Sequence, residues 1–307
     1  MDRLRLSPRA YQRITLVALV ALAFIVVTGA GVRLTGSGLG CPNWPTCDDG
    51  RIVAPLEYHA MVEFVNRMVT GLVSLAVMLA VLGSLVRTPR RRDLTWLSLG
   101  LVAGVLGQIV LGGLVVLFHL FPPLVMGHFV LSMVLLLNAT VLHHRAGIPD
   151  DSTRVPAVAE EHLTLGRLLV VAAGIAILLG TVVTGSGPHA GSHDGELVER
   201  LPFDVGDVAR LHSISVLLFG ALALYLVRSL RLAGAPAAVV GRAQVLLVVL
   251  VAQAGVGYAQ YFLGVPALLV ALHILGAVAV WIAVLRLVLS LRVAVPVTER
   301  ALVGAAP

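Results

Sequence analysis

Residues 266–277, Pro266-Ala-Leu-Leu-Val-Ala-Leu-His273-Ile-Leu-Gly-Ala, form an apolar run that carries a single histidine. A histidine inside a hydrophobic segment of membrane length is costly and marks a functional position by default. The arrangement also occurs earlier in the chain, because Gln108 precedes His128 by 20 residues, as Gln253 precedes His273. Each pair has a glycine four residues after the glutamine and a proline shortly before the histidine. The chain therefore contains this pattern twice.

The composition is that of a membrane protein. Of the 307 residues, 58% are hydrophobic and 12% are charged, and the mean hydropathy is +0.97, whereas about a quarter of the residues in a soluble domain are charged. Several runs of about 20 apolar residues are long enough to cross a bilayer core. The net charge of +6 comes from arginine, because the chain has no lysine. These arginines lie in short loops between the apolar runs, so they do not predict a nucleic-acid surface.

Hydropathy and helix-breaking residues predict an all-α integral membrane protein with eight transmembrane helices. The first span could be mistaken for a signal peptide. It is longer than the apolar part of such a peptide, and no clear cleavage site precedes a soluble domain, so we expect a retained helix. The predicted spans are residues 13–34, 60–86, 94–117, 123–144, 165–185, 207–230, 240–262 and 266–290.

The charged residues predict the orientation in the membrane. Arginines concentrate at the N-terminus, in the even-numbered loops and in the tail, whereas acids gather in the first and fifth loops. By the positive-inside rule, both termini are cytoplasmic and the odd-numbered loops face outward, in a multi-pass protein of the plasma membrane. The arginines are Arg3, Arg5, Arg9, Arg13, Arg87, Arg90, Arg91, Arg92, Arg145, Arg154, Arg167, Arg231, Arg242, Arg292 and Arg300. The acids are Asp48, Asp49, Glu57, Asp194, Glu196, Glu199, Asp204 and Asp207.

The duplication extends beyond the two glutamine–histidine pairs. Thr35-Gly-Ser-Gly38 recurs as Thr184-Gly-Ser-Gly187, and Asn66 holds the place of His212. The four matches have offsets of 149, 146, 145 and 145 residues, which predicts two similar four-helix bundles. Because four is an even number, the two bundles would share one orientation, as a parallel tandem repeat about an axis along the membrane normal. Chance similarity between helices rich in Leu, Val, Ala and Gly is the alternative. The predicted bundles are residues 1–150 and 151–307.

The polar residues of the spans lie in one layer near the outer side. His212 and His273 are about six and seven residues into their spans, roughly 9–10 Å from the outer helix end, and Asn66 and His128 lie at a similar depth. Two histidines on different helices at matched depth suit axial ligation of a haem inside a bundle. A histidine packed against a neighbouring carbonyl is the alternative for each. Zinc is less suited, because no Cys, Asp or third His accompanies the pair at that depth.

The first half differs from the second, because it reads Glu63-Phe-Val-Asn66-Arg67. Glu63 and Arg67 are four residues apart on one helical face, and an ion pair between them would lower the cost of burying both. The other interpretation is a reactive site, in which His128 is the one strong iron ligand. A weak or missing second ligand would leave an open position on the metal, and Glu63 would transfer protons beside it.

The two cysteines, Cys41 and Cys47, lie in the first predicted outer loop. This is the oxidising side of the membrane, where a disulfide closing the short loop would persist. A pair of free thiols and a redox-active pair are the alternatives.

Jointly, these motifs resemble the haem A synthase family. The resemblance covers about residues 15–290 and implies eight spans in two similar bundles. Its implied reaction is the conversion of haem O to haem A, by oxidation of the methyl group at porphyrin C8 to a formyl group through successive hydroxylations. The C-terminal half would bind a haem b cofactor, and the N-terminal half would bind the substrate haem. The motifs are Thr-Gly-Ser-Gly-Leu-Gly-Cys-Pro-Asn-Trp-Pro-Thr-Cys (35–47), Glu63-x-x-Asn66-Arg67, Gly127-His128-Phe129, Thr184-Gly-Ser-Gly-Pro-His-Ala-Gly191, His212 and Leu272-His273-Ile-Leu-Gly276.

The resemblance implies a role for each matching residue. His212 and His273 match the two haem b ligands, and His128 matches a ligand of the substrate haem iron. Cys41 and Cys47 match the outer-loop cysteine pair of the family.

The Glu63–Arg67 segment contains the residue expected to be catalytic, and it differs from the family pattern at one position. Glu63 matches an acid of the second helix that is important for activity, and Asn66 and Arg67 are expected in the haem-binding site. Many members have a histidine in place of Asn66. Asn66 would therefore bond a water or a haem propionate, or leave the iron five-coordinate.

Partners and rival functions follow from the same residues. The oxidation needs an electron acceptor, whose identity the sequence does not give, and the farnesyltransferase that makes haem O is an expected partner by resemblance. A di-haem, quinone-linked cytochrome b is the main rival, but it would ligate both haems alike, whereas Glu63 and Asn66 break the symmetry. A transporter is the second rival, weakened by histidines of metal-ligand type in place of broken helices.

Overall fold

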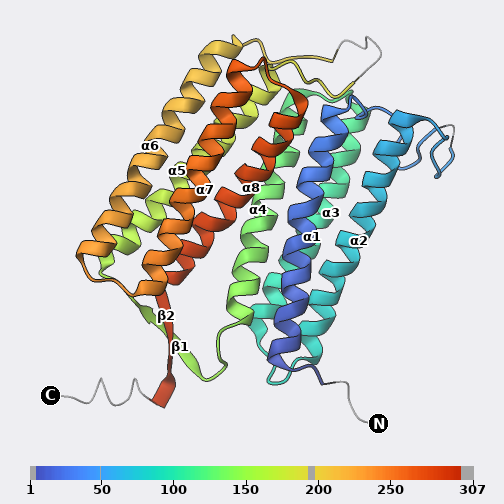
Figure 1. Ribbon diagram of the computed structural model, residues 1–307. Helices are drawn as coiled ribbons and strands as arrows, with labels where there is room; N and C mark the ends of the chain where they lie inside the picture. The colour runs from blue at the N-terminus through green and yellow to red at the C-terminus, as the bar shows by residue number, and fades with distance from the viewer. Residues whose placement is uncertain (1–4, 49, 193–197, 299–307) are drawn as a thin grey trace.

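The computed structural model describes residues 5–48, 50–192 and 198–298. In this part of the chain, eight helices lie side by side, and each is long and apolar enough to cross a membrane (Figure 1). The prediction of eight spans is confirmed. The helices are α1 (Pro8–Leu34), α2 (Tyr58–Val86), α3 (Arg92–Leu117), α4 (Pro122–Ala146), α5 (Glu160–Ser186), α6 (Val205–Leu232), α7 (Ala237–Phe262) and α8 (Ala267–Ser290). Of the charged residues used to predict orientation, Arg3, Asp49, Asp194, Glu196 and Arg300 lie outside the described residues.

Two helices begin well before the predicted spans. The hydroxyl of Ser7 accepts a hydrogen bond from the amide of Ala10 at 3.2 Å and caps α1, with Pro8 in the first turn, a position that suits proline. α5 begins at Glu160 and has two acids in its first turn, where the helix dipole favours negative charge. Both helices therefore continue past the apolar segment by which hydropathy locates a span.

The helices of each half pack in the same order. α1 and α3 each contact α2 and α4, while α5 and α7 each contact α6 and α8. α2 and α4 are thus separated by α1 and α3, and α6 and α8 are separated by α5 and α7. Figure 1 shows α1–α4 on one side of the molecule and α5–α8 on the other, with contacts between them through α1, α4, α5 and α8.

Side chains also join the two halves. The indole nitrogen of Trp281 donates to the carbonyl of Met133 at 2.9 Å in a buried position between α8 and α4. Near the end of α1, the guanidinium of Arg33 donates to the carbonyls of His189 at 2.8 Å and Thr184 at 3.1 Å. The last turn of α1 therefore bonds directly to the last turn of α5 and to the segment that follows it.

A two-stranded antiparallel sheet, which the all-α prediction did not include, follows α4 and α8. Strand β1 (Ser152–Pro156) pairs with β2 (Arg292–Pro296), and Arg154 lies opposite Ala294. The sheet and the start of α1 lie at the same end of the molecule (Figure 1). Its strands are 140 residues apart in sequence, so no local pattern reveals their pairing.

Candidate functional site

His212 on α6 and His273 on α8 lie together, as predicted. Their ring centres are 6.4 Å apart, and the ring planes are inclined by 77°. Two imidazoles that bind one metal have about this separation, because a metal–nitrogen bond is about 2.0 Å long and the nitrogen lies about 1.1 Å from the ring centre. The distance between the two ring centres is therefore compatible with one metal ion between them.

Neighbouring groups fix the orientation of both rings. Nδ1 of His212 lies 3.0 Å from the carbonyl oxygen of Ala176. Because a carbonyl only accepts, Nδ1 carries the proton and the lone pair is on Nε2, the arrangement found in metal-binding histidines. Nδ1 of His273 lies 3.0 Å from the amide nitrogen of Gln253, and the same nitrogen donates to the carbonyl of His273 at 2.8 Å. Because the amide nitrogen of Gln253 donates, Nδ1 of His273 accepts and its Nε2 carries the proton, so of the two histidines only His212 has its lone pair on Nε2.

Each of these rings packs against a glycine of a neighbouring helix. A Cβ at Gly180 would lie 3.2 Å from Cε1 of His212, and one at Gly257 would lie 3.0 Å from Cε1 of His273. These distances are shorter than ordinary van der Waals contact, so a side chain at either position would displace the ring. The glycines therefore help to set where the imidazoles lie.

The first half repeats only part of this arrangement. A Cβ at Gly112 would lie 3.3 Å from Cε1 of His128, so His128 is seated as His273 is. The amide of Gln108 donates to the carbonyl of His128 at 3.1 Å and to the hydroxyl of Ser132 at 2.7 Å. Nδ1 of His128 and Oδ1 of Asn66 are buried and have no hydrogen-bond partner. His128 and Asn66 thus each have a buried polar atom without a hydrogen-bond partner among the described residues.

The space beside Gly31 differs from the space at the matching glycine of the second half. By the Thr-Gly-Ser-Gly repeat, Gly31 is the counterpart of Gly180. Nothing lies within 4 Å of a Cβ built at Gly31, whereas the ring of His212 lies against Gly180. The glycine that adjoins a histidine in the second half thus adjoins free space in the first, where Asn66 replaces that histidine.

Glu63 is held by Arg67 and by the first loop. Its side chain is buried, with the residue only 6% exposed. One carboxylate oxygen accepts from Arg67 Nη2 at 2.6 Å and Nε at 3.1 Å, and the other accepts from the backbone amide of Cys41 at 2.8 Å. The remaining donors of Arg67 reach the carbonyls of Cys41, Asn43 and Thr46. The predicted ion pair therefore exists, and it fastens α2 to the loop; a role of either residue at a haem stays a prediction.

Cys41 and Cys47 form the expected disulfide and are not free thiols. Both cysteines are fully buried, and the loop between them carries Trp44. A Cβ at Gly113 on α3 would lie 2.7 Å from the Trp44 indole, so this ring packs directly on the helix backbone. The closed loop is therefore anchored on α2 by Arg67 and on α3 by Trp44.

Comparison with known proteins now identifies the chain. A family model described as cytochrome oxidase assembly protein, COX15-CtaA, matches residues 12–59 and 53–285. The chain belongs to this family, that of the haem A synthases. The resemblance stated from the motifs is confirmed, and the multi-pass membrane character agrees with it.

Several curated relatives of this family member are named heme A synthase. The protein of Geobacillus kaustophilus is 32% identical over 142 residues, which are 45% of this chain and 42% of the relative. That of Bacillus pumilus is 30% identical over 160 residues, 52% of this chain and 51% of the relative. That of Bacillus licheniformis is 27% identical over 127 residues, 41% of this chain and 42% of the relative. The chain thus spans about half or less of the length of these relatives.

Sequence reasoning missed three parts of this site. The sequence gives no signal for Arg33, and only the fold brings it to the carbonyls of Thr184 and His189. The role of Gly180 depends on a ring from another helix. Arg67 was expected near a haem, and its bonds to three loop carbonyls require the loop conformation. The repeat itself was the available signal for Gly31 and Gly180, since it aligns both with the Thr-Gly-Ser-Gly segments.

Proposed function

We propose that this chain is a membrane-bound haem A synthase, which oxidises the C8 methyl group of haem O to a formyl group through successive hydroxylations. The proposal rests on one difference between the two halves: corresponding positions carry different side chains. The second half has His212 beside His273, and the first half has His128 with Asn66. One half is thus suited to a tightly held cofactor and the other to a haem that must react and leave.

Residues 151–307 would hold haem b through His212 and His273. Bound haem b would supply one-electron transfer. The fit rests on the 6.4 Å ring separation and on the Nδ1–Ala176 contact, which leaves the lone pair of His212 on Nε2. To bind through Nε2, His273 would carry its proton on Nδ1, with the carboxamide oxygen of Gln253 turned toward it. The carbonyl of Ala176 and the amide of Gln253 would keep the rings from turning. Groups that hydrogen-bond to metal-binding histidines commonly orient them in this way.

Residues 1–150 would receive haem O. His128 would be its iron ligand, and Asn66 would not replace a second histidine, because a carboxamide is a weak iron ligand. The free space at Gly31 supports an open position in this half. Glu63 would accept or donate a proton beside it. Oε2 of Glu63 accepts one hydrogen bond from the Cys41 amide and has a second lone pair, which would take the proton.

The proposal includes the topology. The two halves would be four-helix bundles in parallel tandem repeat, supported by the matching order of helix contacts. Arginines at the end that holds the sheet would be cytoplasmic, together with both termini, in the plasma membrane. The odd-numbered loops and the Cys41–Cys47 disulfide would face outward. Expected partners are the farnesyltransferase that makes haem O and an electron acceptor.

The deciding experiment is to express the chain with a source of haem O, extract the haems and resolve them by chromatography. Haem A or its hydroxylated intermediate is the expected product. Haem b alone, with haem O unchanged, would overturn the proposal in favour of a b-type electron carrier. A chain carrying His128→Ala is the matched control, because it should retain haem b and form no haem A.

A further inference from the structure

A polar hollow lies at the end of the molecule that holds the sheet, far from the histidine layer. Its volume is about 430 Å³, and it opens between the ends of α3 and α4 and strand β1. The charged groups that line it are Arg91, Asp93, Arg145, Asp150 and Arg154.

Both acids of this hollow are already neutralised. Asp93 accepts two hydrogen bonds from Arg91, at 2.8 and 3.1 Å. Asp150 accepts two from the buried Arg87, at 2.7 and 3.0 Å. Each carboxylate therefore has a guanidinium of its own, and the other arginines are in excess.

Arg145 and Arg154 are these excess arginines. Arg145 is 3.6 Å from Asp93, which already has two bonds from Arg91, and Arg154 donates to the carbonyl of Leu289 at 3.2 Å. The Nε atoms of both are buried and have no hydrogen-bond partner. Burial, Arg145 and Arg292 lower the pKa of Arg154. The site thus gathers positive charge and unused donors, an arrangement that suits an oxyanion.

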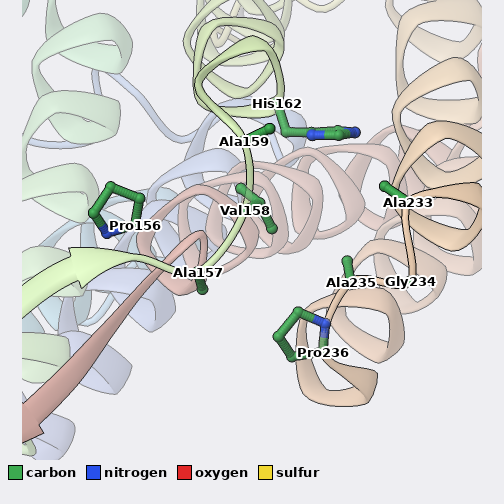
Figure 2. A pocket seen from close by; sticks show the side chains of 9 residues that line it. All are labelled: Pro156, Ala157, Val158, Ala159, His162, Ala233, Gly234, Ala235 and Pro236. Carbon is green, nitrogen blue, oxygen red and sulfur yellow. The ribbon is translucent and has the colours of Figure 1, made fainter. Parts of the chain in front are cut away.

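A second hollow at this end of the molecule has no arginine in its lining. It is lined by residues Pro156–Ala159 and by the turn Ala233–Pro236, which stand on opposite sides of it in Figure 2. Its one ionisable side chain, His162, is bonded through Nε2 to the hydroxyl of Ser229 at 2.9 Å. Of the two hollows at this end, only the first offers guanidinium groups.

We propose that Arg145 and Arg154 bind the phosphate group of an anionic phospholipid, such as phosphatidylglycerol. Arg145 is the residue before the end of α4, so its guanidinium lies where a membrane-spanning helix leaves the apolar layer and lipid phosphates begin. Basic pockets between helices at this level suit lipid head groups, because the membrane surface supplies the anion at high local concentration. A lipid is therefore favoured over dissolved phosphate.

The test is native mass spectrometry of the full chain in detergent with phosphatidylglycerol, phosphatidylcholine or inorganic phosphate. The wild-type chain should retain one phosphatidylglycerol and no phosphatidylcholine. The R145Q/R154Q variant should bind phosphatidylglycerol at least about tenfold more weakly, because two charge-assisted contacts are lost. The matched control is R167Q, which removes the same charge from an exposed arginine of α5 that pairs with Glu160, and it should bind as the wild type does.

Three results would overturn the proposal. These are equal lipid retention in R145Q/R154Q, equal retention of the two lipids, and displacement of phosphatidylglycerol by inorganic phosphate at equal concentration. Should the double variant fail to fold, R145Q alone carries the test, because the pair of Arg145 with Asp93 is long and Asp93 keeps Arg91. Weaker binding by R145Q, with unchanged binding by R167Q, would support the site.

Discussion

The side-chain nitrogen of Gln253 contacts His273 twice, at 3.0 Å from Nδ1 and at 2.8 Å from the carbonyl oxygen. Gln108 makes only the second kind of contact with His128, and its amide bonds to Ser132 instead of the ring. The two glutamines occupy equivalent positions but hold their histidines differently. Gln253 bonds to both the ring and the backbone of His273, whereas Nδ1 of His128 has no hydrogen-bond partner among the described residues.

Gln253→Leu should weaken haem b retention about tenfold, because groups that orient a metal-binding histidine commonly contribute 10–100-fold to affinity. The measurement is the haem b content of the purified protein and its midpoint potential. Gln108→Leu is the matched control and should leave both unchanged. An unaltered haem content and potential in Gln253→Leu would rule out a positioning role.

His212→Ala and His273→Ala should each abolish the low-spin b-type absorption spectrum of the second half. Either change removes one of the two nitrogens that the 6.4 Å ring separation brings to one metal. The control is His119→Asn, at an exposed position between α3 and α4 where φ is 50°, which asparagine tolerates. A normal spectrum in both alanine variants would refute the ligand assignment.

Asn66→His should create a second bis-histidine site. The measurement is the optical and paramagnetic spectrum of the Asn66→His/His273→Ala protein with added haem, in which any low-spin signal arises from the first half. Adding Gly31→Leu should abolish that signal, because leucine fills the space that the new ring needs. A high-spin spectrum in the double variant would contradict this geometry.

Glu63→Gln should keep haem b yet stop the accumulation of haem A. It also leaves Arg67 without its carboxylate, and breaking a buried pair from one side costs about 3 kcal/mol, so the loop must be followed as well. The measurements are haem A content and the thermal midpoint of the purified protein.

The double variant Glu63→Gln/Arg67→Gln separates the two roles of Glu63. Removing both charges should restore part of the stability lost in Glu63→Gln, because no unpaired guanidinium remains. Haem A production should stay absent if Glu63 transfers a proton. Its recovery together with the stability would mean that Glu63 acts only by holding the loop.

Hydropathy predicts the eight helices well, because in lipid the backbone N–H and C=O groups must form hydrogen bonds within the protein, and a helix does this within one segment. Their ends were less accurate, since Ser7 and Glu160 start helices by capping and dipole effects that lie outside the apolar run. The sheet was missed entirely. Its pairing is set by the three-dimensional closeness of the ends of α4 and α8, which no short stretch of sequence encodes.

The site was predictable where the repeat supplied a comparison. Counting residues from the span ends placed His212 and His273 in one layer, and matching the halves set Asn66 against His212. What the repeat does not encode is contact between unlike parts of the chain. The bonds from Arg67 to the loop carbonyls and from Arg33 to the segment after α5 depend on backbone conformation, and their residue types do not indicate their partners.

The pairing of β1 with β2 brings the chain back to the place from which α5 departs. Arg154 enters the second half opposite Ala294, which leaves it. A unit whose two ends meet in this way can be excised, permuted or joined to another sequence without rerouting the chain. The strand pair thus offers engineers two adjacent cut points, one on each strand, at which α5–α8 can be permuted while these helices stay packed on α1 and α4.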